Sequence, residues 1–493
     1  MTNLFSKIFN REKKKMSKNR LENVAVIGMG YVGFPLACAI AKSGKYNVYG
    51  LDIDEAKINK IKNRVSTVED EQASEDIKVV EINATREFSI LKDMKYIVIC
   101  VPTPVDHNKN PDLTPVIKAT ESIAKNLREG QIIILESTVN PGICEEVVLP
   151  ILLETGLEPG VDFNLAHCPE RINPGDSNYN VYNIPRNVGS LTKEGTKIVA
   201  DFYRSFINAP INEVSSLKVT ESTKIVENIF RDVNIAYVNE LAKSFDKLGI
   251  DVVEVIKGAS NKPFAFMPHY PGCGIGGHCI PVDPYYLIDY AKRNGFNHEL
   301  LKNARKINNS MPHYTIEKLV YHLRRLNIPI KNTKIGVLGI SYKANIGDLR
   351  ESPSLEIIDE LKKIGFDVFS FDPYCLNESN SELKELLEEC TAVVVATNHK
   401  EFLKINNWKN IKLIIDGRNC LDKDKINDKI VYDGIGRGFK FEKITNINRV
   451  NEPKRRNAKI VSKYGSNKII ITRINPNLKN SALKLIKGAE ELI

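Results

Sequence analysis

The sequence has no apolar run of the about 18 residues that a membrane-spanning helix needs. Its first 20 residues place apolar side chains before the basic ones, with no hydrophobic segment after them, which argues against a secretory signal. There is also no CxxC pair among the nine cysteines, an odd number scattered from Cys38 to Cys420. Such cysteines are typical of reduced thiols, so we expect a cytoplasmic protein without an integral membrane segment.

The composition lacks every extreme that marks a non-globular chain. Hydrophobic residues make up 42% of the 493 residues and charged residues 27%, the proportions of an ordinary globular protein. Whole-chain disorder, a collagen-like fibre and a small disulfide-stabilised scaffold are therefore excluded. At about 100–200 residues per domain, the length predicts two to four domains.

The positive charge is concentrated at the two ends of the sequence. The formal net charge is +9, but residues 1–20 contribute +6 and residues 437–493 contribute +10, which leaves −7 for residues 21–436. A net positive charge by itself suggests an anionic partner, yet this distribution gives no support for nucleic-acid binding by the body of the protein. We interpret residues 1–20 as a solvated basic lead-in rather than as a weak amphipathic surface anchor.

The first half of the sequence has the pattern of a βαβ unit. Residues 23–28 form a short apolar run that ends in glycines, a helical pattern follows, and residues 47–52 give a second strand that ends in an acid. Further candidates for buried strands are residues 96–101, 131–137 and 163–168. Because helical patterns lie between these runs, we expect a parallel, doubly wound sheet.

The turn after the first strand carries a dinucleotide fingerprint. Gly28, Gly30 and Gly33 form GxGxxG between a strand and a helix, and Asp52 ends the next strand. Glycines let the backbone approach a diphosphate, and the helix N-terminus supplies N–H donors. Asp52 can accept hydrogen bonds from both ribose hydroxyls, whereas a 2′-phosphate would meet an uncompensated carboxylate, so NAD is favoured over NADP. The alternative is a glycine-rich turn without a ligand.

The second half of the sequence repeats the α/β pattern without the fingerprint. Residues 334–340 and 367–373 read as strands, with a helix over 354–366 between them, and the second strand again ends in an acid. Two more strands are predicted over residues 392–397 and 412–418. The turn with Gly336 and Gly339 lacks GxGxxG, so this unit is expected to hold something other than a dinucleotide.

Between the two α/β units, residues 214–310 read as helical. Apolar residues recur at helical spacing over residues 220–250, and no glycine or proline interrupts them until Gly249. This pattern predicts one long helix, which is suited to bridging two domains and to dimerisation. Lys224, Asn228 and Arg231 fall at i, i+4 and i+7 and share one face of it, either as the wall of a site or as a solvated stripe.

A glycine-rich loop contains a candidate nucleophile. Residues 271–286 read PGCGIGGHCIPVDPYY, with Cys279 between two turn-forming stretches and Asp283 four residues later. Such a loop brings backbone close to a substrate and exposes a small nucleophilic side chain. A buried structural cysteine is the competing interpretation, and the spacing matches no familiar zinc ligand set, so no metal is expected.

Seven ordered motifs resemble the UDP-glucose/GDP-mannose dehydrogenase family over roughly residues 22–435. They are VAVIGMGYVGFPLA, CVPTP, ESTVNPG, CPERINPGD, KIVENIFRDVN, GIGGHCIPVDPYYL and YKANIGDLRESPS. In GGHCIxVDP the sequence is most similar to the UDP-N-acetylhexosamine 6-dehydrogenases, which act on UDP-GlcNAc or UDP-ManNAc, because UDP-glucose enzymes carry GGSCFxKD. Pro174 stands where the UDP-glucose enzymes have a second loop glutamate, so that residue's role does not transfer.

The resemblance implies a four-electron oxidation of the sugar C6 alcohol to a carboxylate with two NAD⁺. Cys279 matches the family nucleophile that forms a thiohemiacetal and then a thioester, which water hydrolyses. Lys224 matches a lysine that serves as acid/base or holds the developing oxyanion, together with Asn228. Asp283 would position the water or accept a proton, and Glu170 matches a glutamate near that water.

The resemblance also assigns binding residues. For NAD it implies Gly28, Gly30, Tyr31, Val32, Gly33, Asp52, Thr103 and Thr138, with Arg350 similar to a family arginine that can reach cofactor in a partner subunit. For the nucleotide sugar it implies Arg171, Lys224, Asn228, Arg231, Gly274, Tyr342 and Lys343, with Arg418 as a weaker candidate. Arginine and lysine suit a diphosphate because they pair its oxygens without a metal.

The predicted organisation is two Rossmann-like domains joined by a central helical domain. We expect a basic N-terminal extension (1–20), an NAD-binding domain (21–213), a helical domain with the cysteine loop (214–310), a UDP-sugar-binding domain (311–440) and a basic C-terminal tail (441–493). The predicted activity is an NAD-dependent UDP-N-acetylhexosamine 6-dehydrogenase for polysaccharide or glycan biosynthesis, acting as a homodimer or larger oligomer. The alternatives are a UDP-glucose 6-dehydrogenase, a non-catalytic NAD or nucleotide-sugar binding protein, and a 6-phosphogluconate-type dehydrogenase.

Overall fold

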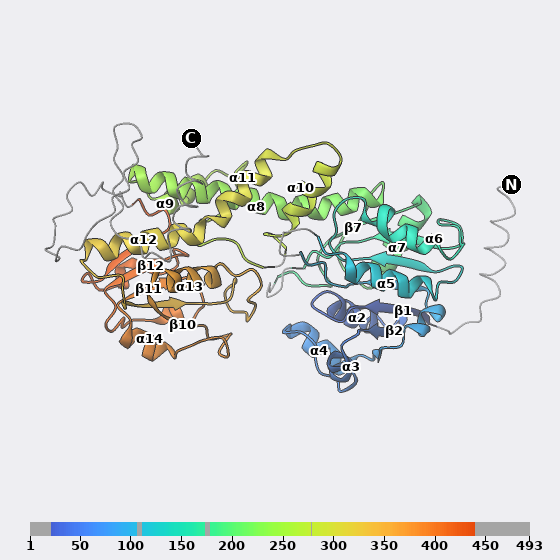
Figure 1. The fold of residues 1–493 in the computed structure, drawn as a ribbon. Coiled ribbons are helices and arrows are strands. Elements are labelled where there is room, and N and C mark those ends of the chain that lie inside the picture. The colour runs from blue at the N-terminus through green and yellow to red at the C-terminus, as the bar shows by residue number, and fades with distance from the viewer. Residues whose placement is uncertain (1–20, 106–110, 173–177, 278, 439–493) are drawn as a thin grey trace, which may run out of the picture. The chain divides into compact units, whose positions relative to one another are not determined.

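The computed structural model describes residues 21–438 apart from 106–110, 173–177 and 278. It confirms the predicted class: two α/β units with largely parallel sheets, and a helical region between them in sequence (Figure 1). The predicted basic N-terminal extension (1–20) and basic C-terminal tail (441–493) lie outside the described residues. Within the described residues, no helix combines the length and the apolar character needed to cross a bilayer.

The first sheet has eight strands in the order β3-β2-β1-β4-β5-β6-β7-β8. The strands are β1 (Glu22–Ile27), β2 (Tyr46–Leu51), β3 (Asn83–Thr85), β4 (Tyr96–Ile99), β5 (Ile132–Leu135), β6 (Asn164–His167), β7 (Arg186–Ser190) and β8 (Ile211–Glu213). The run 3-2-1-4-5-6 is the Rossmann order, with the chain reversing direction across the sheet between β1 and β4. Val24 faces Val48 of β2 on one side and Tyr96 of β4 on the other.

One pairing differs from the all-parallel expectation, because β7 runs antiparallel to β6. A parallel connection normally needs a crossover, usually a helix, to carry the chain back across the sheet. The described residues between β6 and β7 form no helix. β7 accordingly enters the sheet in the direction opposite to that of β6.

Both faces of the first sheet are covered by helices. Alternate residues of β1 point to opposite faces: Val24 and Val26 pack into one core, Ala25 and Ile27 into the other. The helices of the first core are α2 (Gly33–Lys42), α3 (Glu55–Lys62), α4 (Glu71–Val79) and α7 (Lys193–Arg204), and those of the second are η1 (Phe88–Asp93), α5 (Thr114–Ala124), η2 (Cys144–Val148) and α6 (Leu149–Leu153). Burial on both faces explains why these strands read as continuous apolar runs.

The second sheet has five parallel strands in the order β10-β9-β11-β12-β13. They are β9 (Lys334–Leu338), β10 (Asp367–Phe371), β11 (Ala392–Val395), β12 (Leu413–Asp416) and β13 (Val431–Gly434). Helices α12 (Met311–Arg325) and α13 (Pro353–Ile364) cover one face, and α14 (Leu383–Glu389) and η3 (Phe402–Lys404) pack into the core on the other face. A short helix, η4 (Lys423–Lys425), lies between β12 and β13 in sequence. The order corresponds to 2-1-3-4-5, so ligands are expected at the reversal point between β9 and β11.

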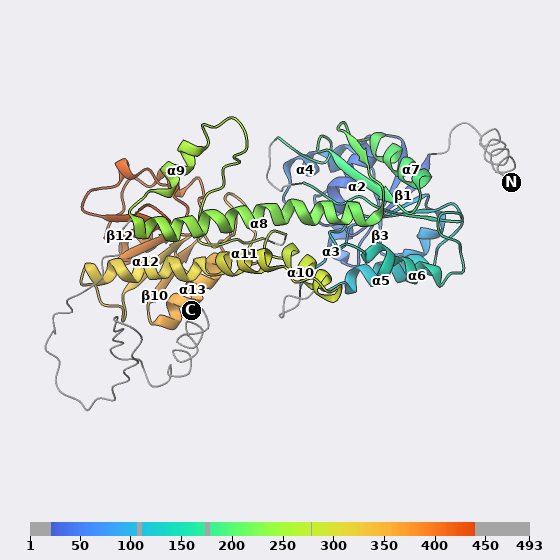
Figure 2. The same ribbon diagram turned by 90° about the horizontal axis from the view of Figure 1, so that it is seen from above.

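The long helix is α8 (Leu217–Leu248), which begins three residues before the predicted start. Ser216 caps it by accepting the N–H of Val219, and Gly249 ends it with a left-handed φ of 74°. Its neighbours in the helical region are α9 (Val252–Ala259), α10 (Asp283–Arg293) and α11 (Glu299–Asn309). Helices α8 and α11 pack side by side (Figure 2).

Candidate active site

The turn after β1 forms a backbone cradle in which two of the three fingerprint glycines are required by close packing. Gly28 has φ +94°, and a Cβ there would lie 2.7 Å from the Cys100 carbonyl oxygen. A Cβ on Gly33 would lie 2.0 Å from the Gly28 oxygen, whereas none of the neighbouring atoms comes within 4 Å of one on Gly30. The space in front of Gly30 is thus open at the start of α2, which fits the close approach of a diphosphate.

The acid that follows β2 is already hydrogen-bonded in this structure. Asp52 Oδ2 accepts from the N–H of Met29 at 2.8 Å and from Lys57 Nζ at 3.1 Å, and Oδ1 accepts from the N–H of Asp54 at 2.9 Å. The expectation of an uncompensated carboxylate at this position is therefore wrong, because Lys57 forms an ion pair with Asp52. A helix that begins just after Asp54 could have indicated this pair. Asp54 caps α3, and Lys57 lies in the first turn of that helix, close to Asp52.

Two further loops at the carboxyl end of the sheet are tied together. The Thr103 hydroxyl donates to the Thr138 carbonyl at 2.8 Å, which joins the loops after β4 and β5. Tyr286 of α10 donates to the Thr103 carbonyl, so the helix that follows the cysteine loop contacts the predicted cofactor loop. Of the other predicted cofactor residues, Tyr31 is 45% exposed and Val32 packs against the core.

Asp283, Asn228 and Cys279 meet where α10 begins beside α8. Asp283 is the first residue of α10, and its N–H donates to the Cys279 carbonyl at 2.9 Å. Asn228 of α8 donates from Nδ2 to Asp283 Oδ2 at 2.5 Å. Burial raises the pKa of Asp283 to about 7, while the Asn228 hydrogen bond and the charge of Lys224 oppose that rise. A carboxyl group with such a pKa is suited to accepting a proton near neutral pH.

The surroundings of the Cys279 thiol favour its protonated form. Its residue is exposed at the surface of the loop, in contrast to the seven buried cysteines. Desolvation by the surrounding protein is the largest effect and raises its pKa to about 11, and the Asp283 carboxylate adds to the rise. Lys224, Arg350 and Arg231 lower the pKa. Formation of the thiolate therefore calls for a base or for extra positive charge near the sulfur.

The glycines before Cys279 allow this loop to lie against the second α/β unit. Gly277 has φ +89°, and a Cβ there would lie 2.8 Å from Tyr342 Cε2. Its N–H donates to the Arg350 carbonyl at 2.9 Å. Gly274 has φ +128°, and a Cβ there would lie 3.2 Å from Pro353. Gly274 and Tyr342 are both predicted to bind substrate. Gly274 thus lies on the loop side of this contact and Tyr342 on the side of the second α/β unit.

The other predicted residues of the second unit, Arg418 and Lys343, are hydrogen-bonded within that unit. Arg418 donates from Nε to the Ala396 carbonyl at 2.8 Å and from Nη2 to the Tyr342 carbonyl at 3.2 Å. The Lys343 carbonyl accepts from Ser341 Oγ at 3.2 Å. These contacts place Arg418 and Lys343 at the carboxyl end of β9, β11 and β12, the edge expected to bind a ligand.

Arg350 lies between the cysteine loop and the cofactor turn of its own chain. Its guanidinium donates from Nε to Asp348 Oδ1 at 3.0 Å and from Nη2 to Oδ2 at 2.6 Å. It lies over the Tyr31 ring, 5.9 Å from the centroid. The family resemblance predicts that Arg350 can reach cofactor in a partner subunit, whereas its contact with Tyr31 lies within one chain.

Glu170 and Arg171 lie together after β6, and each is paired. Glu170 Oε1 accepts from the N–H groups of Arg171 and Ile172, and Oε2 accepts from Arg186 Nη2 at 2.8 Å. Arg171 pairs with Glu227 of α8, with its Nη2 2.7 Å from Glu227 Oε1. No sequence pattern points to Arg186, because it lies in β7, a short strand without an apolar run.

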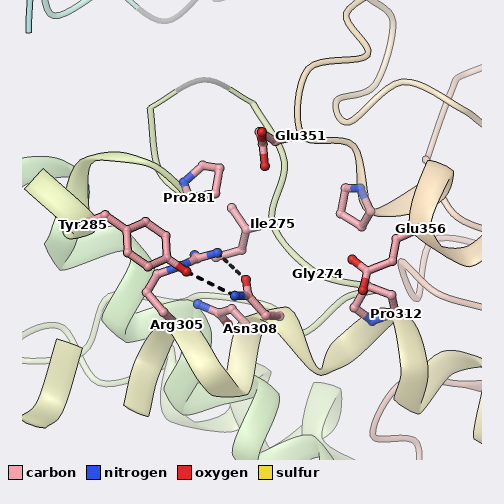
Figure 3. A pocket seen from close by; sticks show the side chains of 11 residues that line it. Gly274, Ile275, Pro281, Tyr285, Arg305, Asn308, Pro312, Glu351 and Glu356 are labelled. Carbon is pink, nitrogen blue, oxygen red and sulfur yellow. Dashed lines mark hydrogen bonds between the residues drawn. The ribbon is translucent and has the colours of Figure 1, made fainter. Parts of the chain in front are cut away.

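A pocket of about 200 Å³ lies beside the cysteine loop (Figure 3). Its walls are Gly274, Ile275 and Pro281 of the loop, Tyr285 of α10, Arg305, Asn308 and Asn309 of α11, Pro312 of α12, and Glu351, Pro353 and Glu356. Arg305 pairs with Asp232 of α8 at 2.5 Å and donates to Asn309 at 2.5 Å. Arg231, next to Asp232, is exposed.

A Rossmann sheet whose first turn forms an open glycine cradle for a diphosphate is the arrangement of a dinucleotide-binding dehydrogenase. Comparison with known proteins identifies the family. Three models of the UDP-glucose/GDP-mannose dehydrogenase family match: the NAD binding domain over residues 22–207, the central domain over 218–310 and the UDP binding domain over 336–423.

Individual proteins and structures show the same similarity. The chain is 37% identical to protein CapL of Staphylococcus aureus, over 82% of this chain and 97% of CapL. It is also 37% identical to a UDP-N-acetyl-D-glucosamine 6-dehydrogenase of Pseudomonas aeruginosa, over 82% and 98% of the two chains. The structure of a UDP-D-ManNAc dehydrogenase from Pyrococcus horikoshii matches with a TM-score of 0.80 and 34% identity, over 85% and 100%. The chain belongs to the UDP-glucose/GDP-mannose dehydrogenase family and is an NAD-dependent oxidoreductase.

Proposed function

We propose that this protein is a UDP-N-acetylhexosamine 6-dehydrogenase that oxidises the C6 alcohol of UDP-GlcNAc or UDP-ManNAc to the carboxylate. The convergence of Cys279, Asp283, Asn228 and Lys224 at the start of α10 carries the proposal, since a thiol beside a base is what oxidation past the aldehyde needs. The loop sequence GGHCIPVDP and relatives with names of this activity support the N-acetylhexosamine substrate.

The proposed reaction has two oxidations and one hydrolysis. Bound NAD⁺ supplies the hydride acceptor for each oxidation, and the chain supplies the remaining groups. The alcohol loses a hydride and a proton to give the aldehyde, to which the Cys279 thiolate adds as a thiohemiacetal. Loss of a second hydride and a proton gives a thioester, and water cleaves its C–S bond to release the carboxylate and the thiol. The net reaction consumes two NAD⁺ and one water.

The environment of each side chain supports a division of roles. Asp283, with a pKa raised to about 7, is suited to taking the proton from the attacking water or from the thiol. Lys224 and Asn228 lie on the adjoining face of α8, where a cation and an amide donor can hold the developing oxyanion. Glu170 accepts three hydrogen bonds, which fix the position of its carboxylate, so we assign it to orienting the water rather than taking the proton.

Substrate and cofactor are proposed to bind at opposite sides of the cysteine loop. Tyr342, Lys343 and Arg418, at the carboxyl end of the second sheet, are assigned to the UDP moiety, and Arg171 and Arg231 to the diphosphate or sugar. The cradle of Gly28, Gly30 and Gly33 is assigned to the NAD diphosphate, and Asp52 to its ribose. Thr103, Thr138, Tyr31, Val32 and Arg350 complete the proposed cofactor site.

We further propose that the protein is a homodimer that forms through α8. Val226, Phe230 and Tyr237 are 57%, 48% and 55% exposed and share one face of this helix, an apolar stripe suited to a second copy. Phe230→Glu should convert the dimer to a monomer in light scattering coupled to size exclusion. A wild-type mass of one chain, or an unchanged dimer in the variant, would contradict this.

All nine cysteines are free thiols, which supports a cytoplasmic location.

An assay of NADH formation with UDP-GlcNAc, UDP-ManNAc, UDP-glucose and GDP-mannose tests the proposed activity. We expect the largest kcat/KM with one of the two N-acetylhexosamines and two NADH per sugar oxidised. A preference for UDP-glucose would identify the rival dehydrogenase, and binding without NADH from any of the four would identify a non-catalytic protein. One NADH per product would instead fit the 6-phosphogluconate type. A role in polysaccharide or glycan biosynthesis follows only if a uronate is formed.

A further inference from the structure

Beneath the two loops at the carboxyl ends of β5 and β6 lies a buried ionic cluster centred on Arg186. Its side chain is 0% exposed and donates from Nη1 to Glu136 Oε2 at 2.9 Å and from Nη2 to Glu170 Oε2 at 2.8 Å. Tyr203 of α7 donates to Glu136 Oε1 at 2.5 Å and presents its ring to the guanidinium, 5.5 Å away. Arg186 thus bridges two carboxylates from neighbouring strands.

Burying this cluster has a large desolvation cost. Two carboxylates and one guanidinium are removed from water together, and Arg186 Nε has no hydrogen-bond partner among the described residues. Buried charges of this kind contribute little net stability compared with apolar side chains of similar volume. Burial raises the pKa of Glu136 to about 7, which shows that desolvation disfavours the ionised form of this carboxyl group. The need to hold the two carboxylates in fixed positions explains the buried cluster better than a contribution to stability does.

The two carboxylates that Arg186 holds begin the two loops that carry proposed site residues. Glu136 leads into Ser137, whose hydroxyl donates to the Val101 carbonyl at 2.6 Å, and into Thr138 of the cofactor loop. Glu170 lies at the turn to Arg171. Arg186 therefore joins the end of β5, which leads to a proposed cofactor residue, to the end of β6, which leads to a proposed substrate residue.

The Glu170 turn in turn contacts the helix that carries the oxyanion residues. Arg171 pairs with Glu227 of α8, which lies between Lys224 and Asn228 in sequence. A displacement of the turn would move Arg171 and the Glu170 carboxylate together, because two backbone N–H groups fix that carboxylate to the turn.

We propose that Arg186 is a positioning residue for the hydrolytic half of the reaction, holding the Glu170 carboxylate where it orients the water that cleaves the thioester. This inference rests on the proposed function. In the step concerned, water oxygen bonds to the acyl carbon, the C–S bond breaks, the Cys279 sulfur recovers a proton, and no electrons leave the substrate. Arg186 itself touches no reacting atom, so its loss should slow hydrolysis more than either oxidation.

The test is the Arg186→Lys variant in rapid-mixing experiments with the nucleotide sugar that the wild type prefers. We expect the ratio of the initial NADH burst to the steady-state rate to rise about 10- to 100-fold over wild type, the range that a misplacement of about 1 Å produces. Intact-mass analysis of acid-quenched protein should show accumulated acyl-enzyme on Cys279. Equal slowing of burst and steady state, or no acyl-enzyme, would overturn the proposal.

Two further variants separate positioning from loss of stability. Lys318→Arg is the matched control, because Lys318 is another fully buried cation that bridges two carboxylates, those of Asp246 at 2.7 Å and Asp433 at 3.0 Å, outside this cluster. It should lower the melting temperature without raising the burst ratio, and a raised ratio would contradict a specific role for Arg186. Glu136→Gln removes one anchor of Arg186 and should raise the burst ratio less than Arg186→Lys. It decides the question if Arg186→Lys does not fold.

Failure of this inference is distinguishable from failure of the proposed function. If the wild type forms no NADH with any nucleotide sugar, the proposed function is wrong. If the wild type is active and Arg186→Lys slows all phases alike, the function stands and the positioning role is refuted.

Discussion

Replacing Asn228 with alanine should move the pH profile of the enzyme, because Asn228 holds the ionised form of Asp283. The two side chains are 7% and 3% exposed, so little solvent screens the 2.5 Å hydrogen bond between them. A hydrogen bond to a charged group is worth about 1.5–3 kcal/mol, and each pKa unit corresponds to about 1.4 kcal/mol. Loss of the bond should therefore raise the pKa of Asp283 by about 1–2 units from its value of about 7.

The sign follows from the form of Asp283 that the reaction uses. Since the carboxylate is the proposed base, kcat/KM rises with pH through the pKa of Asp283, and this rise forms the acid limb of the pH profile. A higher pKa of Asp283 moves the acid limb to higher pH. In Asn228→Ala the limb should lie between about pH 8 and 9, so that at pH 7 the ionised share falls from about one half to one tenth or less. The position of the limb is independent of the fall in kcat that loss of an oxyanion donor also causes.

The measurement is kcat/KM for the nucleotide sugar from about pH 5.5 to 10 at constant ionic strength. Asn234→Ala is the control, since Asn234 lies on the same helix but donates to the Phe230 carbonyl, at 2.6 Å. Its profile should match that of the wild type. An acid limb that does not move in Asn228→Ala, or that moves to lower pH, would refute the assignment of Asp283 as the base held by Asn228.

Three other substitutions test separate parts of the site. Cys279→Ser should abolish uronate formation and acyl-enzyme in mass analysis, and sustained wild-type turnover would refute its role as nucleophile. Gly277→Ala should cost on the order of 1–3 kcal/mol of stability, measured as a lower melting temperature, because it forces a Cβ to within 2.8 Å of the Tyr342 ring at φ +89°. Asp52→Asn should weaken NAD⁺ binding about 10-fold in calorimetry, and unchanged affinity would contradict its role at the ribose.

The buried strands and the long helix were predictable because each has a strong local pattern. Strands β1, β2, β4, β5 and β9 are apolar runs covered on both faces, and the structure places each of them within a few residues of its predicted position. Strands β3, β7, β8 and β13 were missed because they are short and carry polar residues, such as RNVGS in β7. The start of α8 was missed by three residues because the cap is a single serine, Ser216.

The candidate site was only partly predictable for a related reason. The glycine cradle with Asp52 is local, so its residues can be recognised within one βαβ unit. The pairing of Asn228 with Asp283 joins residues 55 positions apart, and the Glu136–Arg186–Glu170 cluster joins three strand ends. No periodicity connects such residues, so their mutual contacts appear only when the sheet and α8 are assembled.

The sequence by itself determined the class of the protein: apolar periodicity dictates two α/β units, and the ordered motifs identify the family. It also located the charge, which lies largely on the two ends and not on the family-like region. Only the tertiary structure decided the protonation chemistry, since the pKa of Asp283 near 7 and that of Cys279 near 11 follow from desolvation by the surrounding protein. Likewise, only the antiparallel entry of β7 brings Arg186 between Glu136 and Glu170. The physical reason is that desolvation and charge pairing depend on which surfaces are brought together in three dimensions, which no local pattern records.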